Sequence, residues 1–342
     1  MALVKYAGGA LLVGLLCTAP AAAPRAQTAQ EFYKGKTVSL VIPNAPGGSF
    51  DLYARLVADN LGRFIPGHPA IVPQNMPGAG GMQAANYLAS IAPKDGTVMS
   101  VLVPNITLAQ VLGVQAIAYD TRKLNWIGRI IATTSTLFTW HTSATKTLAD
   151  LKSRETLIAS TGAVTQAEIN STLLNGVVGT RLKLIRGYRG SAEAALAVER
   201  GEADGTLMPW EFLKAAHADW IRDGKITIVA RFVRRPIPDR PDVPSVYDLA
   251  ETAEQRNVVG LFLGSDEMGH PIAMPPGVPR ERVDAVREAL NTMVDDPAFR
   301  ADAARRQLDL LPGRAEELER SVAEVFEASP AAIEIARKYY KQ

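Results

Sequence analysis

The chain has 342 residues, of which 47% are hydrophobic, and it carries a formal net charge of +2 at pH 7. This length is typical of two domains, and the hydrophobic content is sufficient for a large buried core. The nearly balanced charge argues against a nucleic-acid-binding protein, because such proteins carry a basic field that attracts phosphate.

The N-terminal segment has the three parts of a secretory signal peptide. Lys5 supplies a positive charge, residues 10–16 form a short apolar run, and residues 19–23 offer small side chains for cleavage. The apolar run is well short of the roughly 20 residues that cross a bilayer. We therefore expect export and removal of residues 1–26, which takes away Lys5 and Arg25 and lowers the net charge from +2 to 0.

Cys17 is the only cysteine of the chain, and it lies inside this segment. A lipoprotein signal would place a small residue before the cysteine, but Leu16 stands there. The mature protein would then have neither a disulfide nor a thiol nucleophile. An exported protein of this size without disulfides fits a bacterial periplasm better than a eukaryotic secretory route.

The rest of the chain alternates short β-type runs with helical patterns, which predicts an α/β fold. Strands are expected at 38–42, 70–72, 97–103, 125–131, 135–140, 157–160, 182–185, 226–230 and, after a turn, within 201–208. Helices are expected at 52–64, 82–91, 168–174, 192–200, 279–295, 314–328 and 331–340. Residues 234–244 carry four prolines and are expected to form a connector.

Two glycine-rich turns each follow a β-type run and lead into an apolar-periodic stretch. Residues 46–51 read Pro-Gly-Gly-Ser-Phe-Asp, and residues 77–81 read Pro-Gly-Ala-Gly-Gly. A strand, a glycine turn and a helix start together direct free backbone N–H groups at an anion. The pair therefore predicts a binding site that is built from main chain rather than from reactive side chains.

Other site chemistries find little support in the sequence. The second turn begins like a dinucleotide-binding G-x-G-x-x-G motif, but Gln83 stands where the last glycine belongs, and no G-K-[ST] P-loop occurs. His68, His141, His217 and His270 show no metal-ligand spacing and are interpreted as surface or structural residues. We therefore expect no metal, no cofactor and no catalytic cluster.

Polar residues near the turns have a structural and a functional interpretation. Ser49 is better explained as a helix N-cap or a ligand contact than as a nucleophile, because no G-x-S-x-G elbow surrounds it. Asp51 either complements the helix dipole or organises the turn so that loop amides face a ligand. Asp204, at the start of a strand, is either a turn residue or a ligand contact.

A third, hydroxyl-rich turn lies at the strand-to-helix junction formed by Ser160, Thr161 and Thr165. Hydroxyls and backbone N–H groups can hold a carboxylate without a full counter-charge, since each hydrogen bond to a charged group contributes roughly 1.5–3 kcal/mol. Arg186 and Arg189 are the nearest cations in the sequence, and a solvated surface role is at least as plausible for each.

These motifs together resemble those of the substrate-binding receptors of tripartite tricarboxylate transporters, also called Bug-type receptors. The family element V-P-x-x-P-G-G-x-x-D-x-x-A-R is matched at 42–55, with Ile42 in the first position, and N-x-P-G-A-G-G is matched at 75–81. Weaker matches occur at 93–97, 160–162, 188–190, 201–204, 242–245 and 275–279. The resemblance extends from about residue 32 to the end of the chain.

The resemblance implies a two-lobed, Venus-flytrap periplasmic binding protein fold of type II, with the ligand cleft between the lobes. Residues 30–125 and 232–342 would form lobe one, and residues 126–231 would form lobe two. In this family the two glycine turns hold a ligand carboxylate through main-chain groups and ordered water, and lobe two contributes side chains that vary with the ligand. The implied ligand-binding residues are Asn44, Gly47, Gly48, Ser49, Asp51, Pro77, Gly78, Ala79, Gly80, Gly81, Asn105, Ser160, Thr161, Gly162, Thr165, Arg189 and Asp204.

The chain departs from the family pattern at three places. Asn44 stands where an aromatic residue is common, Arg189 replaces the usual lysine, and His270-Pro271 replaces part of a tryptophan-containing stretch. These changes are compatible with binding of a ligand carboxylate by the glycine turns. They do not indicate which chemical groups make up the rest of the ligand.

The sequence therefore predicts a monomeric periplasmic receptor, not an enzyme, that captures a small carboxylate and delivers it to the membrane subunits of a tripartite transporter. One alternative is an exported hydrolase that uses Ser49 or Ser160. Another is a ligand sensor for a membrane kinase, built on the same fold.

Overall fold

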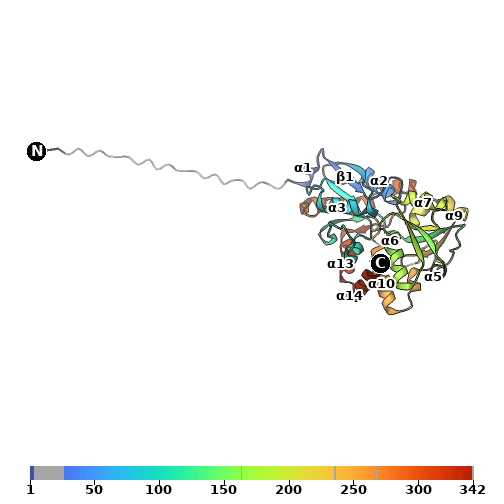
Figure 1. Ribbon diagram of the computed structural model, residues 1–342. Coiled ribbons are helices and arrows are strands. Elements are labelled where there is room, and N and C mark those ends of the chain that lie inside the picture. Colours follow the sequence, from blue (N-terminus) through green and yellow to red (C-terminus); the bar gives the residue numbers. More distant parts are fainter. Residues whose placement is uncertain (4–26, 163, 235, 267, 341–342) are drawn as a thin grey trace.

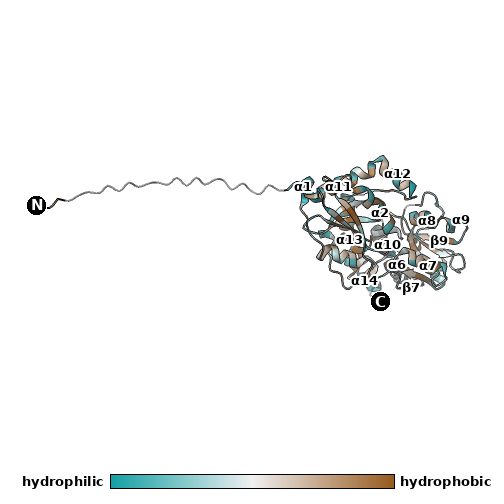
Figure 2. Ribbon diagram, turned by 90° about the horizontal axis from the view of Figure 1, so that it is seen from above, coloured by the Kyte–Doolittle hydropathy of each residue, from teal (hydrophilic) through white to brown (hydrophobic). Residues whose placement is uncertain are grey.

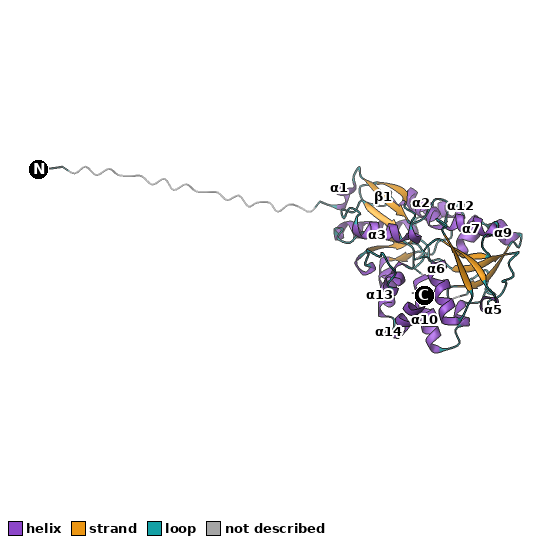
Figure 3. Cartoon of the chain, in the orientation of Figure 1, coloured by secondary structure: helices purple, strands orange, loops and turns teal. Residues whose placement is uncertain are grey.

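The computed structural model describes residues 1–3, 27–162, 164–234, 236–266 and 268–340. The expected signal peptide, with Cys17, lies outside the described residues except for its first three. Two β-sheets with helices packed against them make up the fold, which confirms the predicted α/β class (Figure 3). Within the described ranges, no helix is both long and apolar enough to cross a membrane.

The first sheet has six strands in the order β11-β4-β10-β3-β1-β2. Its three parallel strands are β1 (Thr37–Ile42), β2 (Ala70–Asn75) and β3 (Val98–Val101). β10 (Pro271–Met274) runs antiparallel between β3 and β4 (Asn125–Arg129), and β11 (Gly313–Arg314) forms the edge.

Helices cover both faces of the first sheet, because successive side chains of a strand point to opposite faces. On one face, Leu40 and Ile42 pack with α2 (Ser49–Leu61), α11 (Arg280–Asp295) and α12 (Pro297–Arg305). On the other face, Val41 packs with α3 (Met82–Ser90), α4 (Ile106–Leu112) and α13 (Ala315–Glu327). The short α1 (Ala29–Tyr33) precedes β1, and the 3-10 turns η1 (Ala79–Gly81) and η2 (Thr121–Lys123) precede α3 and β4.

The second sheet has five strands in the order β7-β6-β8-β5-β9. β6 (Thr156–Ser160), β7 (Leu182–Arg186) and β8 (Gly205–Pro209) are parallel, whereas β5 (Ser135–Trp140) runs antiparallel to β8 and to β9 (Ile226–Arg231). Ile158 packs towards α6 (Gln166–Val178), and its neighbour Ala159 packs towards α7 (Ser191–Glu199). The other helices of this half are α5 (Asp150–Ser153), α8 (Trp210–Ala216) and α9 (Ala218–Arg222).

The chain passes between the two sheets twice. It leaves the first sheet after Arg129 and enters the second at Ser135; it then returns after Arg231 through η3 (Val246–Leu249) and α10 (Ala253–Asp266) to β10. The expected lobe boundary at residue 126 falls within β4, which pairs with β10 and β11. We therefore propose that lobe one extends to Arg129.

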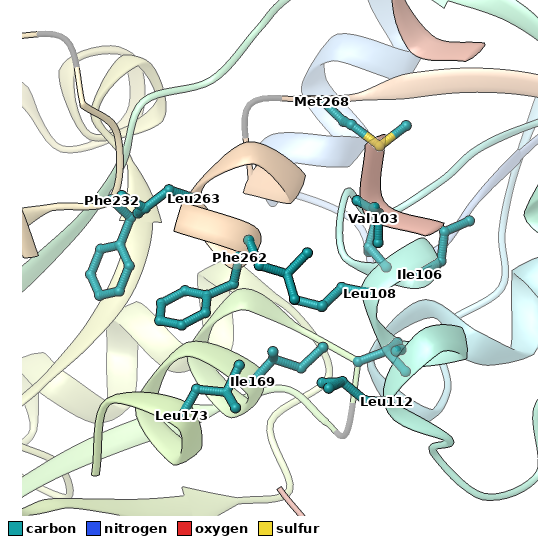
Figure 4. Packing of buried hydrophobic residues seen from close by; sticks show 14 of the residues in the cluster. Val103, Ile106, Leu108, Leu112, Ile169, Leu173, Phe232, Phe262, Leu263 and Met268 are labelled. Atoms are coloured by element: carbon teal, nitrogen blue, oxygen red, sulfur yellow. The ribbon is translucent and has the colours of Figure 1, made fainter. Parts of the chain in front are cut away.

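One hydrophobic core joins the two halves (Figure 4). It combines Ile106 and Leu112 of α4 with Ile169 and Leu173 of α6, and with Phe262 of α10. The C-terminal helix α14 (Pro330–Tyr340) packs against α4, α6 and α10, so the last segment of the chain contacts both halves. Figure 2 shows hydrophobic segments gathered inside each half, and Figure 1 shows the two halves side by side.

Candidate functional site

A narrow cleft lies between the two halves, at the carboxyl ends of β1, β3, β6 and β8. Its free volume is about 50 Å³. The first half contributes Asn44, Phe50, Val103 and Pro104, and the second half contributes Ala159, Thr161, Thr165, Gln166, Ala167, Ser191, Ala194, Thr206, Leu207, Met208 and Pro209. Ligands of open α/β sheets bind in such crevices, because loops and helix starts converge where the parallel strands end.

The first glycine turn is held in place by Asp51. Gly47 has a φ of +87°, a conformation that favours glycine, and its N–H donates to Oδ2 of Asp51 (2.9 Å). Arg55 and Asn75 donate to the same carboxylate at 3.0 and 2.9 Å, and Asn75 also donates to the carbonyl of Asn44 (2.9 Å). Asp51 therefore organises the turn as well as lying in the first turn of α2.

The pKa of Asp51 lies below its usual range although the side chain is buried. Burial by itself raises the pKa, but the hydrogen bonds from Arg55, the Gly47 amide and Asn75 together lower it further. The carboxylate is thus ionised at neutral pH and keeps its three donors.

Ser49 contacts a histidine that is distant in the sequence. Its hydroxyl shares a hydrogen bond of 3.1 Å with Nε2 of His270, whereas Gly48 occupies the N-cap position of α2. The predicted N-cap role of Ser49 is therefore wrong. The ring of His270 packs against those of Phe50 and Tyr53, with centroid distances of 4.1 and 5.2 Å.

Burial makes His270 a poor base. It lowers the pKa of the imidazole to about 3, so the ring is neutral at physiological pH. Within the described part of the chain, Nδ1 of His270 has no hydrogen-bond partner, so no carboxylate completes a Ser-His-acid triad there. Ser49 is 1% exposed, and it is not among the residues that line the cleft.

The second glycine turn meets the opposite half at its backbone. Gly80 has a φ of +69°, and a Cβ at this position would lie 2.7 Å from Cγ2 of Thr165 and 3.0 Å from the carbonyl carbon of Gly162. A Cβ at Gly162 would lie 2.4 Å from the nitrogen of Gly80. Of the described residues that line the cleft, none comes from Pro77, Gly78, Ala79, Gly80 and Gly81. Gly80 lies against Thr165, and a Cβ at Gly81 would lie 2.8 Å from Val103, so this turn adjoins two residues that line the cleft.

The third turn is supported from behind by a buried acid. Thr165 is the N-cap of α6: its hydroxyl accepts from the Glu168 amide (3.4 Å) and donates to the carbonyl of Gly162 (2.8 Å). Ser160 donates to Glu168 (2.9 Å), and Arg186 forms an ion pair with the same carboxylate at 2.6 Å. Thr161 and Thr165 therefore face the cleft, whereas Ser160 stabilises the turn.

The two halves also touch beside the first glycine turn. The N–H of Ala45 donates to the carbonyl of Arg189 (3.3 Å), and a Cβ at Gly48 would lie 3.4 Å from the nitrogen of Ser191. The side chain of Arg189 is 72% exposed and forms an ion pair with Glu193 at 2.6 Å. The structure thus brings the backbone of Arg189 to the cleft, but not its guanidinium.

Asp204 lies at the opposite end of the second sheet from the cleft. Its Oδ2 accepts from the N–H of Leu157 (2.8 Å), at the start of β6. The cleft-lining residues Met208 and Pro209 stand at the other end of β8. This placement matches a structural turn residue, so we leave Asp204 out of the proposed site.

Two amide side chains at the cleft each have one polar atom without a partner among the described residues, an acceptor on Asn44 and a donor on Gln166. Asn44 is 5% exposed, and its Oδ1 has no hydrogen-bond partner among the described residues, nor has Nε2 of Gln166 on the facing wall. Asn105 is fully buried, and neither polar atom of its side chain has a partner in the described ranges, but it does not line the cleft. A buried amide without a partner costs stability, which a polar ligand at Asn44 and Gln166 would relieve.

Several cleft residues were not predicted from the sequence, including Phe50, Gln166, Ser191 and Met208. Each lies in the first turn of a helix or at the carboxyl end of a strand. The rule that ligands bind where parallel strands end could have found them, provided that the strand directions were known.

Comparisons with known proteins find relatives along most of the chain. The model of the tripartite tricarboxylate transporter family receptor matches residues 53–336. The "UPF0065 protein in gbd 5'region" of Cupriavidus necator is 24% identical over 320 residues, which cover 92% of this chain and 91% of the relative. A UPF0065 protein of Bordetella bronchiseptica is 26% identical over 294 residues, which cover 84% and 81% of the two chains.

Solved structures show the same fold at low sequence identity. The periplasmic binding protein BugD has a TM-score of 0.70 and 21% identity, with coverage of 90% of this chain and 98% of its own. MatC from Rhodopseudomonas palustris, solved with bound malate, has a TM-score of 0.69 and 20% identity, with coverage of 88% and 99%. A further R. palustris protein, solved with adipate, has a TM-score of 0.67 and 19% identity, with coverage of 87% and 97%. The likeness confirms the predicted two-lobed fold.

Proposed function

Because this chain belongs to the tripartite tricarboxylate transporter receptor family, we propose that it is a periplasmic receptor that captures a small carboxylate for such a transporter. The observation that carries the proposal is the cleft between the two halves at the ends of the strands, which Thr161 and Thr165 line and which Gly80, through its contact with Thr165, adjoins. Two structurally similar proteins were solved with malate and adipate, both of them carboxylates, which supports a carboxylate ligand here.

In this proposal the first half holds the carboxylate through main chain. The amides at the start of α2 lack partners within the helix and can donate to an anion. At the start of α3, the amides of Met82 and Gln83 already donate to the carbonyls of Ala79 and Gly78. Asp51 keeps the first turn in shape through the Gly47 amide, so it acts on the ligand indirectly. Asn44, Gly48, Thr161, Thr165, Gln166 and Ser191 complete the proposed site.

Closure of the lobes is part of the proposed binding reaction. The contacts of Gly80 with Gly162 and of Ala45 with Arg189 join the two halves beside the cleft, so we propose that the lobes separate to admit the ligand. Hinge closure around a small molecule is a common way to sequester it from water. We propose that two connections between the sheets serve as the hinge: residues 130–134, and the segment that leads from β9 to η3.

The proposed function is to bind a ligand without catalysing a reaction. The contact between Ser49 and His270 is the observation that would favour a hydrolase, but the buried neutral imidazole and the buried hydroxyl fit a structural role better. A Ser49→Ala variant separates the two functions. A hydrolase would lose its turnover, whereas the proposed receptor would keep carboxylate binding with reduced affinity.

The proposal is tested by calorimetry and thermal shift on the mature chain, residues 27–342, against carboxylates and neutral solutes. A micromolar ligand would contribute about −8 kcal/mol of binding free energy. Stabilisation by neutral solutes with no response to any carboxylate would contradict the proposal. Capture of the transporter's membrane subunits from the same organism supports delivery; capture of a membrane kinase instead would support the sensor.

A further inference from the structure

We propose that the side chain of Asn44 selects the ligand: its amide oxygen accepts a hydrogen bond from a hydroxyl group that the ligand carries near its carboxylate. The inference rests on the proposed function, since it concerns the ligand of the same cleft, and it makes hydroxy acids the preferred class. It is carried by a buried acceptor to which a carboxylate cannot donate.

The main chain of Asn44 is held in place by the first half. Its carbonyl accepts from Nδ2 of Asn75 (2.9 Å), and the same Nδ2 donates to Asp51 (2.9 Å). The network that shapes the first glycine turn therefore also fixes Asn44, which lines the cleft just beyond the carboxyl end of β1. A side chain on such a supported backbone can present its amide at a defined place.

The second half covers Asn44. A Cβ at Gly190 would lie 3.7 Å from the Cβ of Asn44 and 3.6 Å from the nitrogen of Ala45. Asn44 is 5% exposed, and within the part of the chain that the structure describes its Oδ1 has no hydrogen-bond partner. Closure of the lobes thus takes this oxygen away from bulk water, and a buried acceptor without a donor is unfavourable.

An ionised carboxylate cannot provide the missing donor. Both of its oxygens are acceptors and neither carries a proton at pH 7, so it pairs with N–H and O–H groups. The amides at the start of α2 and the hydroxyls of Thr161 and Thr165 offer such groups. Because Oδ1 of Asn44 is itself an acceptor, the ligand group that meets it has to be a donor distinct from the carboxylate.

A hydroxyl group also suits the facing wall. Gln166 of the second half lines the same cleft, and its Nε2 is a buried donor with no partner among the described residues. A hydroxyl donates through its proton and accepts through its lone pairs, whereas an ammonium group has no lone pair with which to accept. The free volume of about 50 Å³ places the hydroxyl within a few bonds of the carboxylate.

The first test is calorimetry at pH 7 on the mature chain with acids that differ by one hydroxyl. Suitable sets are propionate with lactate, butyrate with 2-hydroxybutyrate and 3-hydroxybutyrate, and succinate with malate. We expect the tightest-binding acid to carry a hydroxyl and to bind about tenfold more tightly than its parent, which leaves Asn44 without a donor. Tightest binding by a parent acid, or equal binding within its set, overturns the inference but leaves the receptor proposal standing. A chain that binds no acid of these sets contradicts the receptor proposal itself.

Free amino acids separate the hydroxyl from another donor. Free alanine and free aspartate carry an ammonium group where lactate and malate carry the hydroxyl. We expect each amino acid to bind more weakly than its hydroxy counterpart, because it cannot accept from Gln166. Tighter binding of the amino acids overturns the assignment of a hydroxyl.

Asn44→Leu provides the second arm, because leucine has a similar size and no acceptor. Affinity for the hydroxy acid should fall about tenfold while affinity for its parent stays within about twofold, so the preference disappears. Equal losses for the two acids would indicate a purely structural role. That result, or an unchanged preference in the folded variant, overturns the inference.

Asn105→Leu is the matched control. Asn105 is also a buried asparagine, and neither polar atom of its side chain has a partner in the described ranges, but it does not line the cleft. This variant should keep the preference for the hydroxy acid. A loss of preference as large as that in Asn44→Leu contradicts the assignment to Asn44.

Discussion

In each wall of the cleft a carboxylate holds a turn in place, but the two turns present different groups. In the first half, Asp51 hydrogen-bonds directly to the amide of Gly47 and so shapes a glycine turn. In the second half, Glu168 acts through the hydroxyl of Ser160, and the turn presents the side chains of Thr161 and Thr165. Each acid is balanced by an arginine.

The difference indicates that the two walls have different roles in ligand binding. A turn whose contacts come from main-chain amides can hold any carboxylate, because every ligand of the class offers the same oxygen atoms. A wall of side chains can discriminate, because each substitution changes its shape and polarity. We therefore expect changes in the first glycine turn to alter affinity for all ligands and changes in the side chains that line the cleft to alter preference.

The largest effect on binding is expected where the two walls touch. Gly80→Ala places a Cβ 2.7 Å from Thr165 and should prevent full closure, lowering ligand affinity about 100-fold. Gly113→Ala is the matched control, because Gly113 has a similar φ of +76° and open space around its Cβ position. Calorimetry and small-angle scattering with ligand would measure both effects. Equal affinities of the two variants would show that this contact plays no part in closure.

The next effect concerns His270, a buried residue of the first half that contacts Ser49. Its folded pKa of about 3 lies below the ordinary value of 6.5, so between these values the unfolded chain binds a proton that the folded chain does not. The free energy of unfolding should therefore fall by about 2 kcal/mol between pH 7.5 and pH 5 from this group.

Denaturant unfolding across this pH range measures the slope. His270→Gln should flatten it, because this substitution removes the buried imidazole. A slope that survives in a folded His270→Gln protein would assign the pH dependence to other groups.

A smaller effect is expected from substitution of Asp51, the acid that holds the first glycine turn in place. Asp51→Ala removes the acceptor of the Gly47 amide and of Asn75, so the turn loosens and affinity for every carboxylate should fall about tenfold. Asp59→Ala alters an exposed acid on the same helix and should leave affinity unchanged. If calorimetry finds the two variants alike, Asp51 contributes no more than a helix-terminus charge.

The smallest effect on binding is expected at Asp204, which lies far from either wall. Asp204→Ala removes the acceptor of the Leu157 amide and should lower the free energy of unfolding by about 1 kcal/mol. Ligand affinity should stay within about twofold of the original value. A clear loss of affinity without a loss of stability would return Asp204 to the ligand site.

Local features of the structure were predictable from the sequence. The glycine turns, the alternation of strands and helices, and the helices α11, α13 and α14 follow from periodicity and from glycine's tolerance of positive φ, which act within a few residues. The two-lobed arrangement was predicted from the resemblance of the motifs to those of the receptor family. The helices α10 and α12 were missed, because charged and small residues blur their periodicity.

Only the tertiary structure decided which residues share the cleft. Ser49 meets His270 across 221 residues of sequence, and Tyr339 of α14 occupies the space beside Gly176 of α6. Asp204 immediately precedes β8 and Met208 lies within it, yet only the carboxyl end of this strand reaches the cleft. The physical reason is that strand order and direction come from pairing between distant segments, whereas the sequence pattern reports only what each segment prefers by itself.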